Sequence, residues 1–187
     1  MHGAVTDSAP AVDPVAFRRA LGRFATGVTV ITALTPDGAP AGCTVSAFCS
    51  VSMDPPLVLA CIGRGRSMHR TLAEVTGFAV NILRSDQADL ARCFARSGAD
   101  RFTGVATRPA PDGVPLLDGT IASLRCERHE LLEGGDHTIV LGRVVDLHVD
   151  EGEPLLYSRG AFLDLPEPDW QRALATAPHE WLLSAPW

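Results

Sequence analysis

Within residues 41–56, the middle positions from Cys43 to Met53 alternate strictly between a small apolar set and a set of hydroxyl residues with one aromatic, and Asp54-Pro55-Pro56 ends the pattern. Because successive side chains of a strand point to opposite faces, we expect one continuous strand with two distinct faces. The small apolar face suits a core and comprises Cys43, Val45, Ala47, Cys49, Val51 and Met53. The other face suits an acceptor-rich ligand and comprises Thr44, Ser46, Phe48, Ser50 and Ser52. An ordinary half-buried strand with a solvated face explains the same pattern, so both readings stay open.

Periodicity along the rest of the chain predicts about six strands and three helices. An aspartate followed by proline begins a helix expected over residues 13–24, and the other two helices are expected over 68–75 and 85–95. Further strands are predicted over residues 27–34, 57–62, 78–83, 121–132, 138–149 and 155–157. The strand over 57–62 is continuously apolar, which predicts burial on both faces. The strand over 27–34 should form a hairpin with the alternating segment, because a Pro-Asp-Gly turn lies between them.

Strands that follow one another at short spacing favour one fold class. We expect a mainly β fold with peripheral helices, built as a closed or half-closed barrel, and no alternating βαβ sheet. Residues 95–115 carry several prolines and glycines and are expected to form an irregular loop, which in a domain is often functional.

Composition narrows the class of protein. The chain has 187 residues, of which 46% are hydrophobic and 20% charged, which predicts one globular domain. We expect a flexible arm over residues 1–12, the domain over 13–165 and a tail over 166–187. A net charge of −6 argues against nucleic-acid or anionic-membrane partners. Five scattered cysteines without metal spacing predict reduced thiols in a cytoplasmic protein and no metal site.

One loop carries side chains that suit a phosphate. Residues 63–67 contain Arg64, Arg66 and Ser67 between glycines that let a ligand approach the backbone. Arginine and hydroxyl groups make charge-assisted hydrogen bonds to phosphate oxygens. A solvated turn with two surface arginines is the simpler explanation of this loop taken alone.

Two other segments suit a planar or charged ligand. Residues 134–138 place Asp136 and His137 at the start of a strand, where the histidine either contacts a planar ligand or only pairs with Asp136. Arg96 and Ser97 begin the irregular loop, ahead of Asp100-Arg101-Phe102, and are a weak signal by themselves. Glycine-rich dinucleotide and phosphate-loop motifs are absent from the sequence, so a Rossmann-type site is not expected.

Taken together, these segments resemble the flavin reductase family with the FMN-binding split-barrel fold. This family supplies the reductase half of two-component flavin-dependent monooxygenases. The resemblance covers roughly residues 14–163, in the family's order. The matching segments read FRRALGRFATGVTVITA, GCTVSAFCSVSMDPPLVLACI, GFAVNIL, DLARCFA, RFTGV, GDHTIVLGRVVDL and PLLYSRG.

The resemblance implies a homodimer whose two subunits shape one flavin site. It also implies NADH or NADPH binding, hydride transfer to flavin N5 and release of reduced FMN or FAD to a partner monooxygenase. By position, the flavin ring and ribityl chain would contact Cys43, Thr44, Val45, Ser46, Ala47, Cys49 and Ser50. The flavin phosphate would contact Arg64, Arg66 and Ser67, with further contacts from Arg96 and Ser97. The nicotinamide would meet the catalytic residue His137 beside Asp136, with Tyr157 and Arg159 completing that side.

Hydride transfer between two bound rings is mainly a task of orientation, so this chemistry needs no acid–base pair from the protein. His137 is therefore expected to position the nicotinamide. Two alternatives remain: a flavin-binding sensor or carrier without reductase activity, and a split-barrel oxidase related to pyridoxamine phosphate oxidases. The turn at His137 argues against both, and the SVSMDPP segment also argues against the second.

Overall fold

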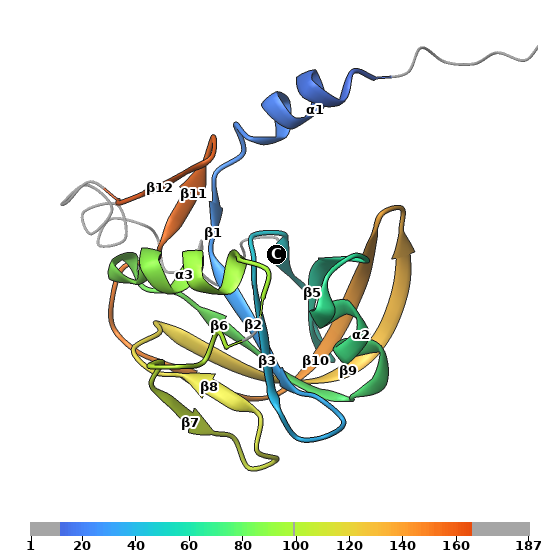
Figure 1. Cartoon of the computed structure of the whole chain (residues 1–187), viewed down its shortest axis with the longest axis vertical. Coiled ribbons are helices and arrows are strands. Elements are labelled where there is room, and N and C mark those ends of the chain that lie inside the picture. The colour runs from blue at the N-terminus through green and yellow to red at the C-terminus, as the bar shows by residue number, and fades with distance from the viewer. Residues whose placement is uncertain (1–11, 99, 166–187) are drawn as a thin grey trace, which may run out of the picture.

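The fold is that of a computed structural model, which describes residues 12–98 and 100–165. The arm predicted over residues 1–12 is described only at Val12, and the predicted tail over 166–187 lies outside the described residues. Within the described ranges there are three α-helices and one 3-10 helix, namely α1 (Pro14–Leu21), α2 (Ser67–Glu74), α3 (Ala88–Ala95) and η1 (Ser85–Gln87). The predicted mainly β class with peripheral helices is confirmed, as Figure 1 shows.

Seven antiparallel strands form the main sheet. Their order across the sheet is β3-β2-β6-β9-β10-β5-β4, and every neighbouring pair is antiparallel. The strands are β2 (Thr29–Leu34), β3 (Pro40–Val45), β4 (Phe48–Met53), β5 (Pro56–Gly63), β6 (Gly77–Ile82), β9 (Ala122–Gly134) and β10 (His137–Val149). The predicted hairpin of β2 with β3 is confirmed, with Thr29 opposite Val45 and Leu34 opposite Pro40.

The alternating segment over residues 41–56 is not one strand, and here the sequence prediction is wrong. It divides at Ser46 and Ala47 into β3 and β4, which lie at opposite edges of the sheet. Three Cα steps of about 3.6 Å separate Val45 from Phe48, so the two edges must come within about 11 Å of each other. The sheet therefore curls until its edges meet. No ladder of hydrogen bonds joins the edge strands β3 and β4 within the described residues, so the expected barrel is an open, curled sheet.

Two apolar clusters cover the two faces of the sheet. One includes Ile31, Val45 and Ile62 and packs against Met68 and Leu72 of α2. The other joins Val30 of β2 and Leu83, just beyond β6, to Ala91 and Phe94 of α3. Ile31 and Ala33 of β2 belong to the first cluster and Val30 to the second, so this strand is buried on both faces.

The strand β5 departs from its predicted burial. Its residues alternate, with Val58, Ala60 and Ile62 buried and the residues between them half-buried. A continuous apolar run predicts a strand covered on both sides. One face of β5 instead lines cavities, which also accept apolar side chains.

The apolar face predicted for residues 43–53 is only half buried. Cys43 and Val45 on β3 lie in the core, whereas Val51 and Met53 on β4 are 43% and 71% exposed. β4 lies at the other edge of the sheet from β3, and these two apolar side chains of β4 are exposed to solvent. Alternation along the sequence does not reveal such a change of edge.

Helix α1 begins as predicted but ends earlier. The carboxylate of Asp13 accepts hydrogen bonds from the backbone N–H groups of Val15 and Ala16, at 3.4 and 2.9 Å. The helix ends at Leu21 instead of near Phe24, and none of its residues is buried. Figure 1 shows it standing clear of the sheet. Its apolar face therefore has no partner within the described chain.

Five short strands complete the described fold and exceed the predicted number. The expected irregular loop over residues 95–115 contains β7 (Thr107–Pro109), which pairs with β8 (Pro115–Leu117). The strand predicted over residues 155–157 is β11 (Leu156–Ser158), which pairs with β1 (Thr26–Gly27) and with an unpredicted β12 (Ala161–Leu163). Strands of two or three residues carry too little pattern to be read from sequence.

Candidate functional site

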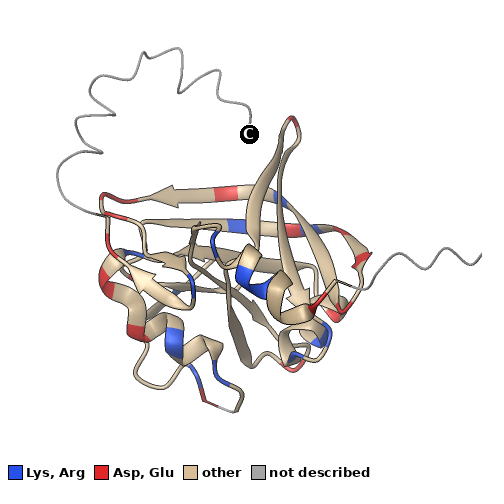
Figure 2. Cartoon of the chain, turned by 90° about the horizontal axis from the view of Figure 1, so that it is seen from above, with Lys and Arg blue, Asp and Glu red and all other residues tan. Residues whose placement is uncertain are grey.

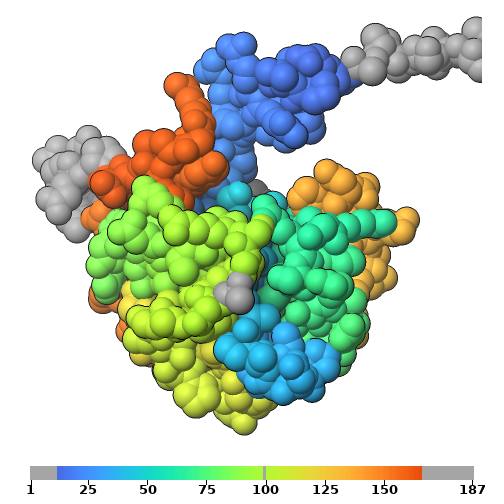
Figure 3. All heavy atoms as spheres, viewed as in Figure 1, coloured from blue at the N-terminus to red at the C-terminus, as the bar shows by residue number. Residues whose placement is uncertain are grey.

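A cleft of about 240 Å³ lies where the two edges of the curled sheet meet. Figure 3 shows a crevice at this place, between the light-green α3 side and the teal α2 side. One wall comes from β3, the other from β5, and the starts of α2 and β10 close one end. The lining residues are Cys43–Val45, Ser46, Ala47, Cys61, Ile62, Gly63, Arg66, Ser67, Phe94, Ala95, Arg96, Arg101 and His137.

Three arginines give the cleft a cationic side. Arg66 donates from Nη1 to the hydroxyl oxygen of Ser97 at 3.5 Å, so these residues from the start of α2 and the loop after α3 lie together. Arg101 donates from Nη1 to the carbonyl oxygen of Gly42, while its buried Nε has no hydrogen-bond partner within the described residues. A buried guanidinium donor without a partner fits an anionic ligand, since desolvated N–H groups are costly to leave unpaired. The donors therefore suit a phosphate.

The predicted face of hydroxyl residues contributes only Thr44 and Ser46 to the cleft, which is less than the sequence pattern predicts. Thr44 donates its hydroxyl to the carbonyl oxygen of Ala91 at 2.7 Å, which ties β3 to α3. Ser46 lies at the bend between β3 and β4, where its exposed side chain lines the cleft. The bend, and not a row along one strand, presents a hydroxyl and backbone groups to a ligand.

The thiol of Cys43 is not a candidate nucleophile. Burial raises its pKa to about 12, and the nearby guanidinium groups of Arg101 and Arg66 only partly offset that rise. The thiol is therefore neutral near neutral pH and packs as a small apolar side chain.

The His137 turn closes one end of the cleft. His137 is the first residue of β10 and lies opposite Gly63 of β5. Its Nδ1 is 2.8 Å from the Oδ1 of Asp136, and this hydrogen bond is the main cause that lowers the pKa of the Asp136 carboxyl. Because Nδ1 is held by Asp136, the ring is oriented while Nε2 is left for a ligand. His137 thus pairs with Asp136 and also lines the cleft, and its contact with a planar ligand stays a prediction.

The structure brings together most of the predicted site residues. Cys43 to Ala47, Arg66, Ser67, Arg96 and His137 all line this cleft, and Ser97 and Asp136 contact residues that do. Thr44 and Ser46 of the predicted hydroxyl face and the His137 turn therefore meet in one cleft.

Five predicted residues lie elsewhere in the described chain. Arg64 turns outward and pairs with Glu133, with 3.2 Å between Nη2 and Oε1. Cys49 lines a separate apolar cavity, and Ser50 is an exposed residue of β4 outside the cleft. Tyr157 and Arg159 line another cavity beside α1. The division of the 41–56 segment explains the positions of Cys49 and Ser50, because β4 leaves the cleft after Ala47.

Sequence reasoning missed Arg101, Cys61 and Phe94 as lining residues. The sequence places Arg101 in the irregular loop just after Arg96, and its local pattern predicts no role for it. The ring of Phe94 meets Phe102 edge to face at 5.0 Å, and this contact brings the loop with Arg101 over the cleft. The adjacent residues Arg101 and Phe102 were the sequence feature that could have pointed to this contact, because an aromatic residue in a polar loop often anchors the loop to the core.

Metal-binding clusters and membrane-spanning helices are both absent from the described ranges. These ranges contain no group of three or more metal-binding side chains able to hold an ion. They also contain no helix with the length and apolar character needed to cross a membrane.

A curled antiparallel sheet with a cationic cleft between its edges defines a mainly β protein suited to a flat, anionic ligand. The family of flavin reductase like domains matches residues 21–166. This match covers well over half of the chain, so the chain belongs to that family.

Relatives and solved structures agree with this assignment. An FMN reductase (NADH), SmoA, from Agrobacterium fabrum is 45% identical over 146 residues, which are 78% of this chain and 83% of the relative. The reductase component of 4-nitrophenol 4-monooxygenase/4-nitrocatechol 2-monooxygenase from Rhodococcus opacus is 42% identical over 151 residues, 81% of this chain and 80% of that protein. The NADH:FAD oxidoreductase SgcE6 from Streptomyces globisporus, solved in complex with NAD and FAD fragments, superposes with a TM-score of 0.79 at 41% identity, covering 85% of this chain and 98% of that one.

Proposed function

We propose that this chain is an NAD(P)H-dependent flavin reductase that reduces FMN or FAD and supplies the reduced flavin to a partner monooxygenase. The observation that carries the proposal is the convergence of the β3 edge, three arginines and His137 on one cleft. Relatives named as NADH-dependent reductases of FMN and of FAD support the reaction, and a relative named as a monooxygenase reductase component supports the partner.

The residues of the cleft divide the work of binding. Arg66, Arg101 and Arg96 would hold the flavin phosphate, with Ser67 at the start of α2 adding a hydroxyl. When bound, the flavin would accept a hydride at N5 from C4 of the reduced nicotinamide. The small side chains of Cys43, Val45 and Ala47 would leave space for a flat ring against β3.

His137 would orient the nicotinamide against the flavin ring. Its ring is held by Asp136 and stands at the end of the cleft opposite the α3 wall. Because hydride transfer requires the reacting atoms to lie about 3–3.5 Å apart, an oriented ring at this point contributes by positioning. A flavin carrier or sensor would not need this contact, which favours the reductase over that alternative.

A homodimer completes the proposed site. The cleft of about 240 Å³ is smaller than the roughly 300–1,000 Å³ of typical small-molecule sites, which leaves room for a second subunit to add to the flavin's surroundings. Exposed apolar residues surround it on three elements, and exposed patches of this kind mark interfaces. They are Val15, Phe17 and Leu21 on α1, Val51 and Met53 on β4, and Leu131 and Leu132 at the end of the β9–β10 hairpin.

The remaining assignments are part of the same proposal. We place the functional domain at residues 13–165, because the cleft and every element that supports it lie there. All five cysteines are free, which fits a reducing, cytoplasmic compartment. No nucleic-acid or membrane partner is proposed, and Figure 2 shows acidic and basic residues interspersed over the described surface.

A direct assay tests the proposal. Purified protein mixed with NADH and either FMN or FAD should oxidise NADH at a rate that depends on all three components. Under anaerobic conditions the absorbance of oxidised flavin should disappear in equal amount. Flavin binding without NADH oxidation would establish the carrier alternative instead.

A further inference from the structure

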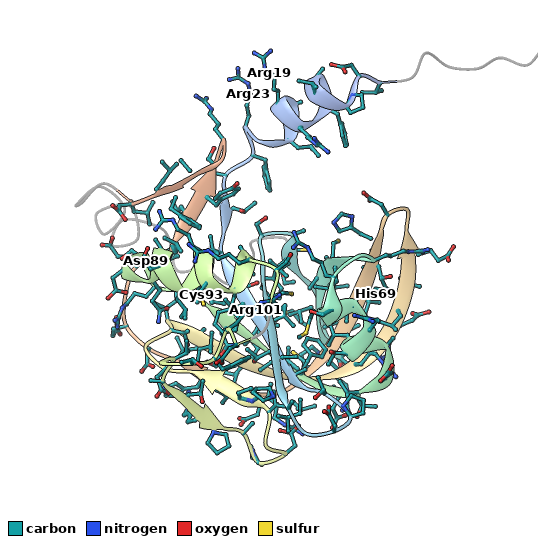
Figure 4. The ribbon with its side chains drawn as sticks, in the orientation of Figure 1. Arg19, Arg23, His69, Asp89, Cys93 and Arg101 are labelled. Atoms are coloured by element: carbon teal, nitrogen blue, oxygen red, sulfur yellow. The ribbon has the colours of Figure 1, made fainter. Side chains whose placement is uncertain are left out.

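A second cationic cavity lies outside the cleft, where α1 meets the turn between β11 and β12. Its volume is about 520 Å³, and four of its seven lining residues are arginines. Figure 4 shows two of them, Arg19 and Arg23, together at the C-terminal end of α1. The complete lining is Arg18, Arg19, Gly22, Arg23, Tyr157, Arg159 and Gly160, and we call it the arginine pocket.

The four guanidinium groups of the arginine pocket have no acceptor of their own. Within the described residues, none of them makes a side-chain hydrogen bond or an ion pair, and no carboxylate lines the cavity. Other arginines of the chain do have carboxylate partners, for example Arg84 with Asp86 at 2.8 Å and Arg125 with Asp112 at 2.9 Å. Grouping like charges without partners opposes folding. In a chain with a net charge of −6, such a group points to an anion from outside.

The dipole of α1 explains only part of this cluster. Arg18 and Arg19 lie in the last helical turn, where cations are stabilised by about 0.3–1 kcal/mol. Arg23 lies beyond the end of the helix, and Arg159 comes from a segment more than a hundred residues later. The helix dipole therefore accounts for Arg18 and Arg19 but does not explain why Arg23 and Arg159 line the same cavity.

The backbone holds Arg159 in place against α1. Its φ is +51°, in the left-handed region that residues other than glycine rarely adopt. Its backbone N–H donates to the carbonyl oxygen of Gly22 at 2.8 Å, and the hydroxyl of Ser158 donates to the same oxygen at 3.3 Å. The turn is thus fastened to the helix end, with the arginine side chains of both elements around one space.

An apolar cavity lies between the arginine pocket and the cleft and shares lining residues with both. The pocket shares Gly22 and Tyr157 with an apolar cavity of about 560 Å³, which is also lined by Phe24 and Phe48. That cavity in turn shares Ser46, Ala47 and Cys61 with the cleft. The molecule therefore presents two cationic ends joined by an apolar middle.

We propose that the arginine pocket binds phosphates of the adenylyl half of an adenine dinucleotide whose reactive ring lies in the cleft. This inference rests on the proposed reductase function. Multiple guanidinium groups suit phosphate oxygens, and the apolar cavity between the sites suits the uncharged parts of the ligand. FAD and NAD(P)H both carry this chemistry, and FMN lacks it.

The test compares ligands with and without an adenylyl half. The double variant Arg19→Gln/Arg23→Gln removes two charges from exposed side chains, and Arg108→Gln on β7 serves as a matched control distant from both sites. Binding of FMN and FAD is measured by quenching of flavin fluorescence, and KM is measured for NADH and NADPH with FMN as acceptor. Thermal melting and size-exclusion chromatography check the fold and the oligomeric state.

The expected result is a rise of about tenfold or more in the Kd for FAD, or in KM for NADH or NADPH, with the Kd for FMN unchanged. The ligand that responds identifies the source of the phosphates. Unchanged constants for all three dinucleotides would overturn the inference, as would an equal loss of FMN binding. Conversion of a wild-type dimer into a monomer would also overturn it, because the cluster would then bind a second copy of the chain. Failure of the wild-type protein to bind any flavin would instead refute the proposed function itself.

Discussion

At the scale of single residues, the cleft depends on side chains whose partners come from distant parts of the chain. Arg101 lies in a loop after α3, yet it donates to the carbonyl of Gly42 on β3 and keeps its buried Nε unpaired within the described residues. His137 is oriented by its neighbour Asp136 but lines the cleft opposite residues of β3 and α3. Each of these side chains thus makes one hydrogen bond within the described chain and keeps a second nitrogen for a ligand, Nε in Arg101 and Nε2 in His137.

Replacing His137 tests its role in positioning the nicotinamide. We expect His137→Ala to lower kcat/KM for NADH by about 10- to 100-fold, because misplacement of the reacting atoms is costly, while the flavin Kd stays nearly unchanged. Steady-state kinetics and fluorescence titration provide the two readouts. His148→Ala is the matched control, since His148 also lies on β10 and pairs with an aspartate, Asp150, at 3.1 Å. Unchanged kinetics in the His137 variant would refute the role.

Replacing Arg101 tests the anion side of the cleft. Arg101→Met keeps most of the length of the side chain and removes the charge, so we expect the Kd for FMN to rise about 10- to 100-fold. Isothermal titration or fluorescence quenching measures the change. Arg108→Met, which disturbs only a surface pair with Asp118 at 3.6 Å, should bind FMN like the wild type. Equal affinities for all three proteins would exclude Arg101 from the site.

At the scale of elements, close packing between side chains of neighbouring strands decides which residues a strand position tolerates. Gly142 of β10 is buried against β6 and β9. A Cβ at this position would fall well inside the contact distance of the Phe78 ring and 3.2 Å from the Cβ of Cys126. The absence of a side chain on Gly142 therefore gives Phe78 its space in the core.

An alanine at Gly142 should destabilise the sheet. We expect Gly142→Ala to lower the free energy of unfolding by about 1–3 kcal/mol, because a well-packed core must shift to admit the methyl group. Urea denaturation followed by circular dichroism measures the loss. At the strand glycine Gly27, an added methyl group would meet no atom within 4 Å, so Gly27→Ala should cost much less. Similar stabilities of the two variants would contradict this account of β10.

At the scale of the whole molecule, the curl of the sheet creates the cleft, and exposed apolar residues around it require a cover. The side chain of Phe24, just beyond α1, is 77% exposed and lines the apolar cavity next to the cleft. Since one protomer leaves such residues to solvent, we expect the proposed homodimer to bury them.

A charge at Phe24 should weaken the dimer. We expect Phe24→Glu to raise the dimer dissociation constant about tenfold or more, because a carboxylate would be buried at the interface. Sedimentation of wild type, Phe24→Glu and the apolar control Phe24→Leu over a range of concentrations measures the effect. A wild-type protein that remains a monomer at all concentrations would contradict the dimer.

The sequence was sufficient for much of the fold, and about two thirds of the residues it predicted for the site line the cleft or contact residues that do. Local patterns determined the helix start at Asp13, the hairpin of β2 and β3 and the long strands β9 and β10, because each depends on neighbours in the chain. The order of segments also determined the family. The loop with Arg66 and the turn with His137 were found because their residue types carry their chemistry wherever they lie.

Only the tertiary structure decided which of these residues meet. The bend at Ser46 and Ala47 sends β4 to the far edge of the sheet, so Cys49 and Ser50 leave the cleft although the alternation continues through them. Arg101 enters the cleft through a loop contact, and Arg159 joins α1 through hydrogen bonds to Gly22. The pairing of strands and the docking of loops depend on contacts between residues far apart in sequence. The alternation of apolar and polar residues along a short segment therefore does not predict them.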